Sequence, residues 1–192
     1  AAHEIAHHRL HKNMKLPPDT FSTLNVIEGA EKHLKTGRQE LEANQFAAEL
    51  LMPSPLFLNL AKGKPFTPQL LRDLAIRFKT SLTATAFRYA ESDLHPVCLV
   101  MTENGNVKYF KMSAGMKCWL GDITRLPPPA QSVAMEYMQR GYEYLYHLEE
   151  KAQQIMKSVW FSVREWEEDE MFYEYCIPTK KYKTILSIIW QK

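Results

Sequence analysis

The first residues of the chain, Ala1-Ala2-His3-Glu4-Ile5-Ala6-His7, contain the pattern His-Glu-x-x-His. On a helix, side chains four residues apart lie on the same face, so His3 and His7 can bind one metal ion. Glu4 lies beside that face, where its carboxylate can accept a proton from water. The pattern predicts a zinc hydrolase with His3 and His7 as metal ligands and Glu4 as the catalytic base. The alternative is a surface helix with fortuitous histidine spacing.

A catalytic zinc site needs a third protein ligand and one open position. A second helix, expected over residues 38–52, carries Glu40 and Glu42 near its start. Glu40 and Asn44 lie one turn apart on one face, whereas Glu42 lies about 200° around the helix from Glu40. Both glutamates therefore cannot face the same metal. We favour Glu40 as the third ligand, keep Glu42 as the alternative, and expect Asn44 to orient a metal ligand by a hydrogen bond.

Hydrophobic periodicity predicts helices in the first half of the chain and mainly strands in the second. The expected helices cover residues 3–12, 38–52, 55–63, 68–78, a segment from Ser81 or Thr83 to about 90, and 131–141. The expected strands cover 97–101, 107–110, 159–161, 171–177 and 183–190, and residues 142–159 give no clear pattern. This order predicts an α+β protein with two modules, residues 1–92 and 93–192.

Composition narrows the class of protein. A chain of 192 residues with 45% hydrophobic residues suits one large or two small soluble domains. The formal charge of +2 does not indicate a nucleic-acid binder, and no apolar run is long enough for a membrane span. Three widely spaced cysteines without a Cys-x-x-Cys pair favour a reducing cytoplasm.

Only two residues precede the first candidate ligand, His3. A helix end this short frays where ligand geometry must be fixed. We therefore expect the helical module to lack a native N-terminal part that braces the motif.

The two helices together resemble a known family. The motif His3-Glu4-Ile5-Ala6-His7, followed by Glu42-Ala43-Asn44-Gln45-Phe46-Ala47-Ala48-Glu49-Leu50-Leu51-Met52-Pro53, is similar to the ImmA/IrrE family of bacterial metallopeptidases. The pair of motifs is much more specific than either alone. Weaker similarity continues through the helices at 54–92 and into the final segment 184–190.

The resemblance implies a gluzincin-like zinc endopeptidase that cleaves a protein substrate, a DNA-binding transcriptional repressor, in mobile-element or stress-response control. It also implies a smaller, mainly β, sensor-like second module of GAF-like type. Zinc is the expected metal, and Mn is an alternative because a His, His, Glu site accepts several divalent ions. No direct nucleic-acid or membrane partner is expected. A non-catalytic metal-binding regulatory protein on the same fold is the alternative function.

Overall fold

The computed structural model describes residues 2–10, 34–143, 145 and 152–191, and within 34–41 it describes the helical backbone but not the side chains. The chain forms two compact units, residues 1–59 and residues 60–192. Each unit is described by itself below. The α+β class predicted from the sequence is confirmed, because helices and an antiparallel sheet make up the fold.

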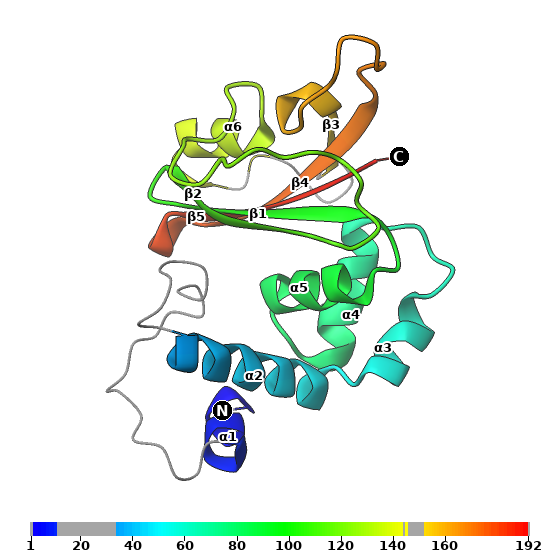
Figure 1. Ribbon diagram of the computed structural model, residues 1–192, viewed down its shortest axis with the longest axis vertical. Helices are drawn as coiled ribbons and strands as arrows, with labels where there is room; N and C mark the ends of the chain where they lie inside the picture. The colour runs from blue at the N-terminus through cyan, green and yellow to red at the C-terminus, as the bar shows by residue number, and fades with distance from the viewer. Residues whose placement is uncertain (1, 11–33, 144, 146–151, 192) are drawn as a thin grey trace. The chain divides into compact units, whose positions relative to one another are not determined.

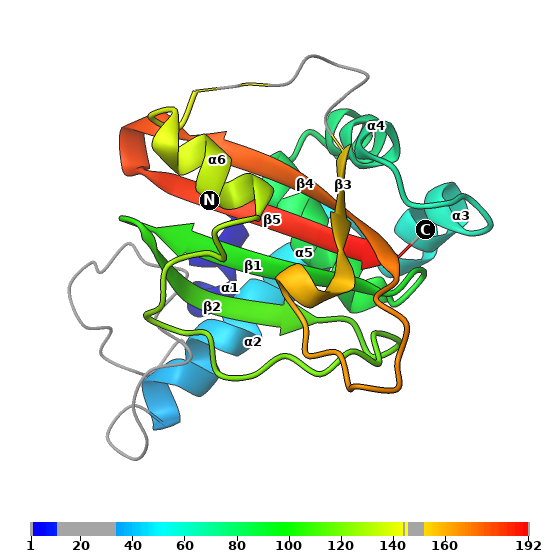
Figure 2. The same ribbon diagram turned by 90° about the horizontal axis from the view of Figure 1, so that it is seen from above.

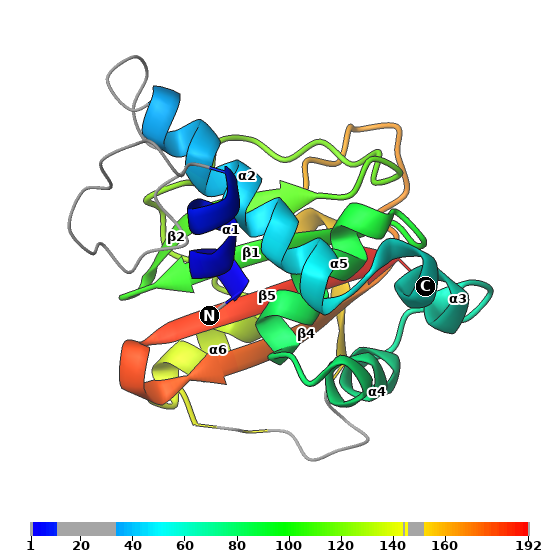
Figure 3. The same ribbon diagram turned by 90° about the horizontal axis from the view of Figure 1, so that it is seen from below.

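The first unit contains α1 (Ala2–Leu10), α2 (Leu34–Leu51) and most of α3 (Ser54–Ala61). Helix α1 packs against α2 (Figures 1 and 3). Ala6 on α1 and Ala43 on α2 are both fully buried. Small side chains allow two helices to approach closely, so the packing brings the motif on α1 near the middle of α2.

The turn between α2 and α3 is fixed by one carboxylate. Glu49 accepts hydrogen bonds from the backbone amide of Ser54 at 2.8 Å and from its hydroxyl at 2.7 Å. The amides at the start of a helix have no intrahelical partner, so this contact caps α3. Pro53, between the two helices, stops the continuation of α2.

In the second unit, α4 (Pro68–Phe78) and α5 (Leu82–Ser92) begin at side-chain caps. Thr67 accepts from the amide of Leu70 at 3.0 Å, and Ser81 accepts from the amide of Ala84 at 3.1 Å. The predicted helix at 68–78 is confirmed residue for residue. Of the two caps considered for the next helix, Ser81 is the one used.

The five strands form one antiparallel sheet in the order β2-β1-β5-β4-β3. Their bounds are β1 (Val97–Glu103), β2 (Asn106–Met112), β3 (Ala152–Met156), β4 (Met171–Thr179) and β5 (Thr184–Gln191). Helix α5 packs on one face of the sheet, and α6 (Val133–Gln139) packs on the other, across β4 and β5 (Figures 1 and 2). The sheet is therefore the middle layer of this unit.

Residues on the inner strands β1, β5 and β4 alternate between two apolar cores. Cys98 and Val100 of β1 join Val133 and Tyr137 of α6 in the cluster on one face. On the other face, the ring of Phe66 lies 4.9 Å from that of Tyr89 and 4.7 Å from that of Trp190. Strand side chains point to alternate faces, so a shift of one residue in strand pairing would move these side chains out of their cores. The observed pairing of the strands is therefore required for both cores.

The predicted strand at 159–161 is wrong. The structure has a short 3-10 helix, η1 (Lys157–Val159), and the amides of Trp160 and Phe161 both donate to the carbonyl of Lys157, at 3.2 and 2.9 Å. The two aromatic side chains are buried in the core beneath α6. The two residues are apolar because they are buried in the core, although they do not belong to a strand. The strand in this region is β3, which lies in the stretch that gave no clear pattern.

Glu174 of β4 is a fully buried carboxylate. It accepts hydrogen bonds from five groups: the amides of Val133 at 2.8 Å and Ala134 at 3.2 Å, the indole of Trp160 at 3.1 Å, the hydroxyl of Ser187 at 2.8 Å and the thiol of Cys176 at 3.4 Å. Burial raises the pKa of Glu174, and the bonds from Trp160 and Ser187 oppose that shift. This carboxylate joins the start of α6 to β4, β5 and η1.

Within the described ranges, no helix combines the length and the apolar character needed to cross a lipid bilayer.

Candidate metallopeptidase site

Helix α1 directs the two motif histidines toward one point. The Nε2 atoms of His3 and His7 lie 3.0 Å apart, and the two rings meet edge to face with centroids separated by 4.6 Å. His7 is buried and His3 is half-buried. The spacing of one helical turn thus brings the two nitrogens together, as the sequence motif requires.

Helix α2 fixes the orientation of His3. The Nδ1 atom of His3 lies 2.9 Å from the side-chain oxygen of Asn44. An amide oxygen only accepts, so the hydrogen is on Nδ1 of His3 and the lone pair is on Nε2, toward His7. Asn44 therefore holds His3 in the tautomer that can bind a metal through Nε2.

The two nitrogens suit the metal that the motif implies. A tetrahedral zinc ion with Zn–N bonds of about 2.0–2.1 Å separates two ligand nitrogens by about 3.3 Å. The observed separation is 3.0 Å. A shift of a few tenths of an ångström, within the reach of side-chain rotation, is enough, so His3 and His7 fit such an ion.

The structure describes the side chains of two of the three glutamates predicted for the site. Glu4 is exposed on α1, next to His3. Glu42 is half-buried on α2, and the side chain of Glu40 lies outside the described residues. Among the described side chains, no group of three or more His, Cys, Asp or Glu is arranged to hold a metal ion. The choice between Glu40 and Glu42 as third ligand stays a prediction.

A small residue on each helix lies where the two helices of the site pack together. Ala43, directly before Asn44, is fully buried on α2, as Ala6 is on α1. In the sequence, an alanine near the candidate ligands on each helix indicates that the two helices pack closely there, since small residues mark places where helices come close.

Removing the Asn44 side chain should weaken metal binding. We expect Asn44→Ala to lower zinc affinity about 10–100-fold, because His3 loses the acceptor that fixes its tautomer and ring orientation. Asn44→Asp keeps an acceptor at that position and serves as the matched control. Competition with a chromogenic chelator measures both, and an unchanged affinity in Asn44→Ala would contradict the orienting role.

A His-Glu-x-x-His helix packed on a second helix that holds one of its histidines is the arrangement of a metallopeptidase domain. Residues 1–89 match the family model of the IrrE N-terminal-like domain. This match supports the resemblance of this part of the chain to the ImmA/IrrE family of metallopeptidases. No curated protein matches the sequence.

Among solved structures, a Mycobacterium tuberculosis transcriptional regulator is similar in fold, with a TM-score of 0.50 and 12% sequence identity. The similarity covers 84% of this chain and 47% of that one, so the chain spans about half the length of the regulator. At this identity the likeness concerns the fold alone.

Proposed function

We propose that the protein is a zinc-dependent endopeptidase that hydrolyses peptide bonds of a protein substrate. The observation that carries this proposal is the contact chain Asn44, His3, His7, in which a second helix orients a histidine of an intact His-Glu-x-x-His motif. The match of residues 1–89 to the model of the IrrE N-terminal-like domain supports it.

Each residue of the motif has a distinct role in this reaction. His3 and His7 bind the metal through Nε2, and Asn44 keeps the hydrogen of His3 on Nδ1. When bound, zinc supplies Lewis-acid polarisation of the scissile carbonyl and of the attacking water. The exposed carboxylate of Glu4 accepts a proton from the water as it attacks, and later delivers that proton to the leaving amine.

We infer that Glu40 completes the metal site. Glu40 is one helical turn before Asn44 on α2, and the side chain of Asn44 contacts His3. Glu42 lies about 200° around the helix from Asn44.

Glu40→Ala should therefore weaken zinc binding more than Glu42→Ala, by about 10-fold or more, because it removes a direct ligand. Calorimetric titration with zinc compares the two variants. A larger loss in Glu42→Ala would assign the third ligand to Glu42.

The substrate that we propose is a DNA-binding transcriptional repressor in the bacterial cytoplasm, in mobile-element or stress-response control. The test incubates the purified, zinc-loaded protein with the repressor encoded beside its gene and follows the fragments by mass spectrometry. Cleavage that stops with a chelator and returns with zinc supports the proposal, and Mn is tested in parallel. A metal-loaded protein that leaves the repressor intact would favour the non-catalytic, metal-binding alternative.

For residues 93–192 we propose a regulatory, sensor-like module of GAF-like type. Support comes from the antiparallel sheet with helices on both faces. The family match ends at residue 89, within α5, whereas the compact units divide after residue 59. Limited proteolysis that yields a stable fragment starting near residue 93 would support the predicted boundary, and cleavage near residue 60 would replace it.

A further inference from the structure

An exposed loop between η1 and β4 combines negative charge with a large apolar side chain. We call residues 162–170 the acidic tryptophan loop. It contains five acidic residues and one arginine, in a chain whose formal charge is +2. Trp166 is 78% exposed, the highest value among the large hydrophobic side chains described as exposed. A tryptophan in this position is a common anchor for a partner protein.

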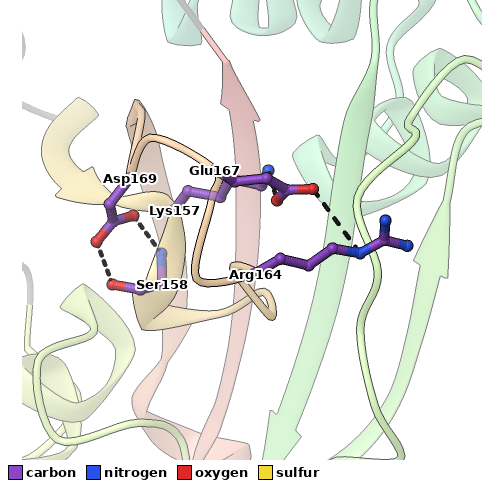
Figure 4. A network of polar contacts seen from close by, with 5 residues as sticks. All are labelled: Lys157, Ser158, Arg164, Glu167 and Asp169. Carbon is purple, nitrogen blue, oxygen red and sulfur yellow. Dashed lines mark hydrogen bonds and ion pairs between the residues drawn. The ribbon is translucent and has the colours of Figure 1, made fainter.

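The loop is held in one shape by contacts on its inner side (Figure 4). Glu167 accepts a hydrogen bond from Lys157 at 3.2 Å. This bond holds the pKa of Glu167 below the usual range for a glutamate. Asp169 accepts from the amide of Ser158 at 2.9 Å and from its hydroxyl at 2.6 Å. These two carboxylates are used within the fold. The bracing lowers the entropy that a partner must overcome on binding.

The other carboxylates face solvent. Glu165, Glu168 and Glu170 are exposed. The guanidinium of Arg164 lies over the ring of Trp166, 5.6 Å from its centroid. The indole therefore already stacks with an arginine of its own chain, and its wide exposure leaves area for a second cation.

Further apolar side chains lie at the same end of the sheet. Met156 of β3 and Met171 of β4 are paired across the two strands and are 42% and 46% exposed. Trp119 is 70% exposed, and its carbonyl accepts from the amide of Ser162, at the start of the loop, at 3.0 Å. Exposed methionine and tryptophan side chains gathered in one place are typical of a protein-binding surface.

We propose that the acidic tryptophan loop is a docking surface for an arginine-rich segment of another protein. Arginine pairs with Glu165 and Glu168 through bidentate hydrogen bonds and stacks on Trp166. An arginine-rich segment therefore matches both the negative charge and the exposed aromatic ring of the loop. Nucleic acid does not fit, because phosphates are repelled by the carboxylates. This inference does not depend on peptidase activity.

A second copy of the chain is the less favoured occupant. Its basic turn, Lys180 to Lys183, is partly used within the chain: Lys180 pairs with Glu143 at 2.5 Å, and Lys181 lies over the ring of Tyr182 at 5.3 Å.

The test is calorimetric titration of the full chain with a synthetic peptide that alternates Arg and Ala. We expect Glu165→Lys with Glu168→Lys to weaken binding about tenfold, equivalent to about 1.4 kcal/mol, and Trp166→Ala to weaken it about fivefold. A Lys/Ala peptide should bind more weakly than the Arg/Ala peptide, since arginine also stacks.

The matched control is Asp73→Lys with Glu91→Lys, which makes the same change in charge on exposed positions of α4 and α5. Binding that survives this control and fails in the loop variant supports the proposal. Equal losses in both pairs, or no loss in the loop variant, would overturn it, as would sedimentation data showing that the loop binds a second copy. If the reversal pair misfolds, Glu165→Gln with Glu168→Gln gives the same comparison.

Discussion

Replacing Glu4 by glutamine is expected to abolish peptide hydrolysis while leaving metal binding intact. Glutamine has the size of glutamate but cannot take a proton from the attacking water, and the loss of a general base costs about 10²–10⁴ in rate. The hydrogen bond between His3 and Asn44 and the contact between His3 and His7 do not involve Glu4, so we expect both to persist. Because Glu4 is exposed, the substitution should not affect folding.

The measurement is kcat/KM for cleavage, together with zinc content, for the wild type, Glu4→Gln and the control Glu91→Gln. Glu91 is an exposed carboxylate on α5 that pairs with Lys111 at 2.7 Å, so its replacement should leave the rate unchanged. Undiminished cleavage by Glu4→Gln would remove Glu4 from the role of base. A protein without zinc would instead show that Glu4 supports the metal site itself.

The second large effect concerns stability. We expect Glu174→Ala to lower the free energy of unfolding by about 3–5 kcal/mol, because several buried donors lose their acceptor together and a cavity forms. The amides of Val133 and Ala134 at the start of α6 and the indole of Trp160 are among them. Urea unfolding followed by circular dichroism measures the loss. Glu168→Ala, at an exposed position, is the control and should change stability by less than about 0.5 kcal/mol.

The pH dependence of this effect has a definite sign. Burial raises the pKa of Glu174 in the folded protein above the ordinary glutamate value of 4.5. The folded state therefore binds the proton more tightly than the unfolded state. This difference adds to the free energy of unfolding, and the added stability is fully present below about pH 4.5. It is lost as the pH rises through the folded-state pKa. The stability of the wild type relative to Glu174→Gln should fall over this window, and a rise would contradict the assigned direction.

Much of the fold could be predicted because local signals agree with tertiary packing. Thr67 followed by Pro68 marks the start of α4, and the structure uses both. The region around β3 failed for the opposite reason. Gln153 and Gln154 lie on an edge strand that buries little, so no alternation is visible, whereas Trp160 and Phe161 are apolar because they fill the core from a turn.

In the candidate site too, features set by local geometry could be predicted, whereas those set by tertiary packing could not. The spacing of His3 and His7 suffices to predict that their nitrogens converge, because helix geometry is local. The contact between His3 and Asn44 depends on how two helices pack over a separation of 41 residues, which periodicity does not give. The two glutamates near the start of the helix expected at 38–52 pointed to it as the second helix, and the spacing of Glu40 and Asn44 suggested an orienting role for Asn44. The structure adds the contact itself.

The division of the chain after residue 59 determines which spectroscopic signals report on the motif helices. All four tryptophans and all nine tyrosines follow residue 59, so intrinsic emission comes from the sheet unit alone. Far-ultraviolet circular dichroism would detect loss of structure in α1 and α2, while that emission reports on the second unit. Different transition midpoints from the two probes would therefore indicate that α1 and α2 unfold separately from the sheet.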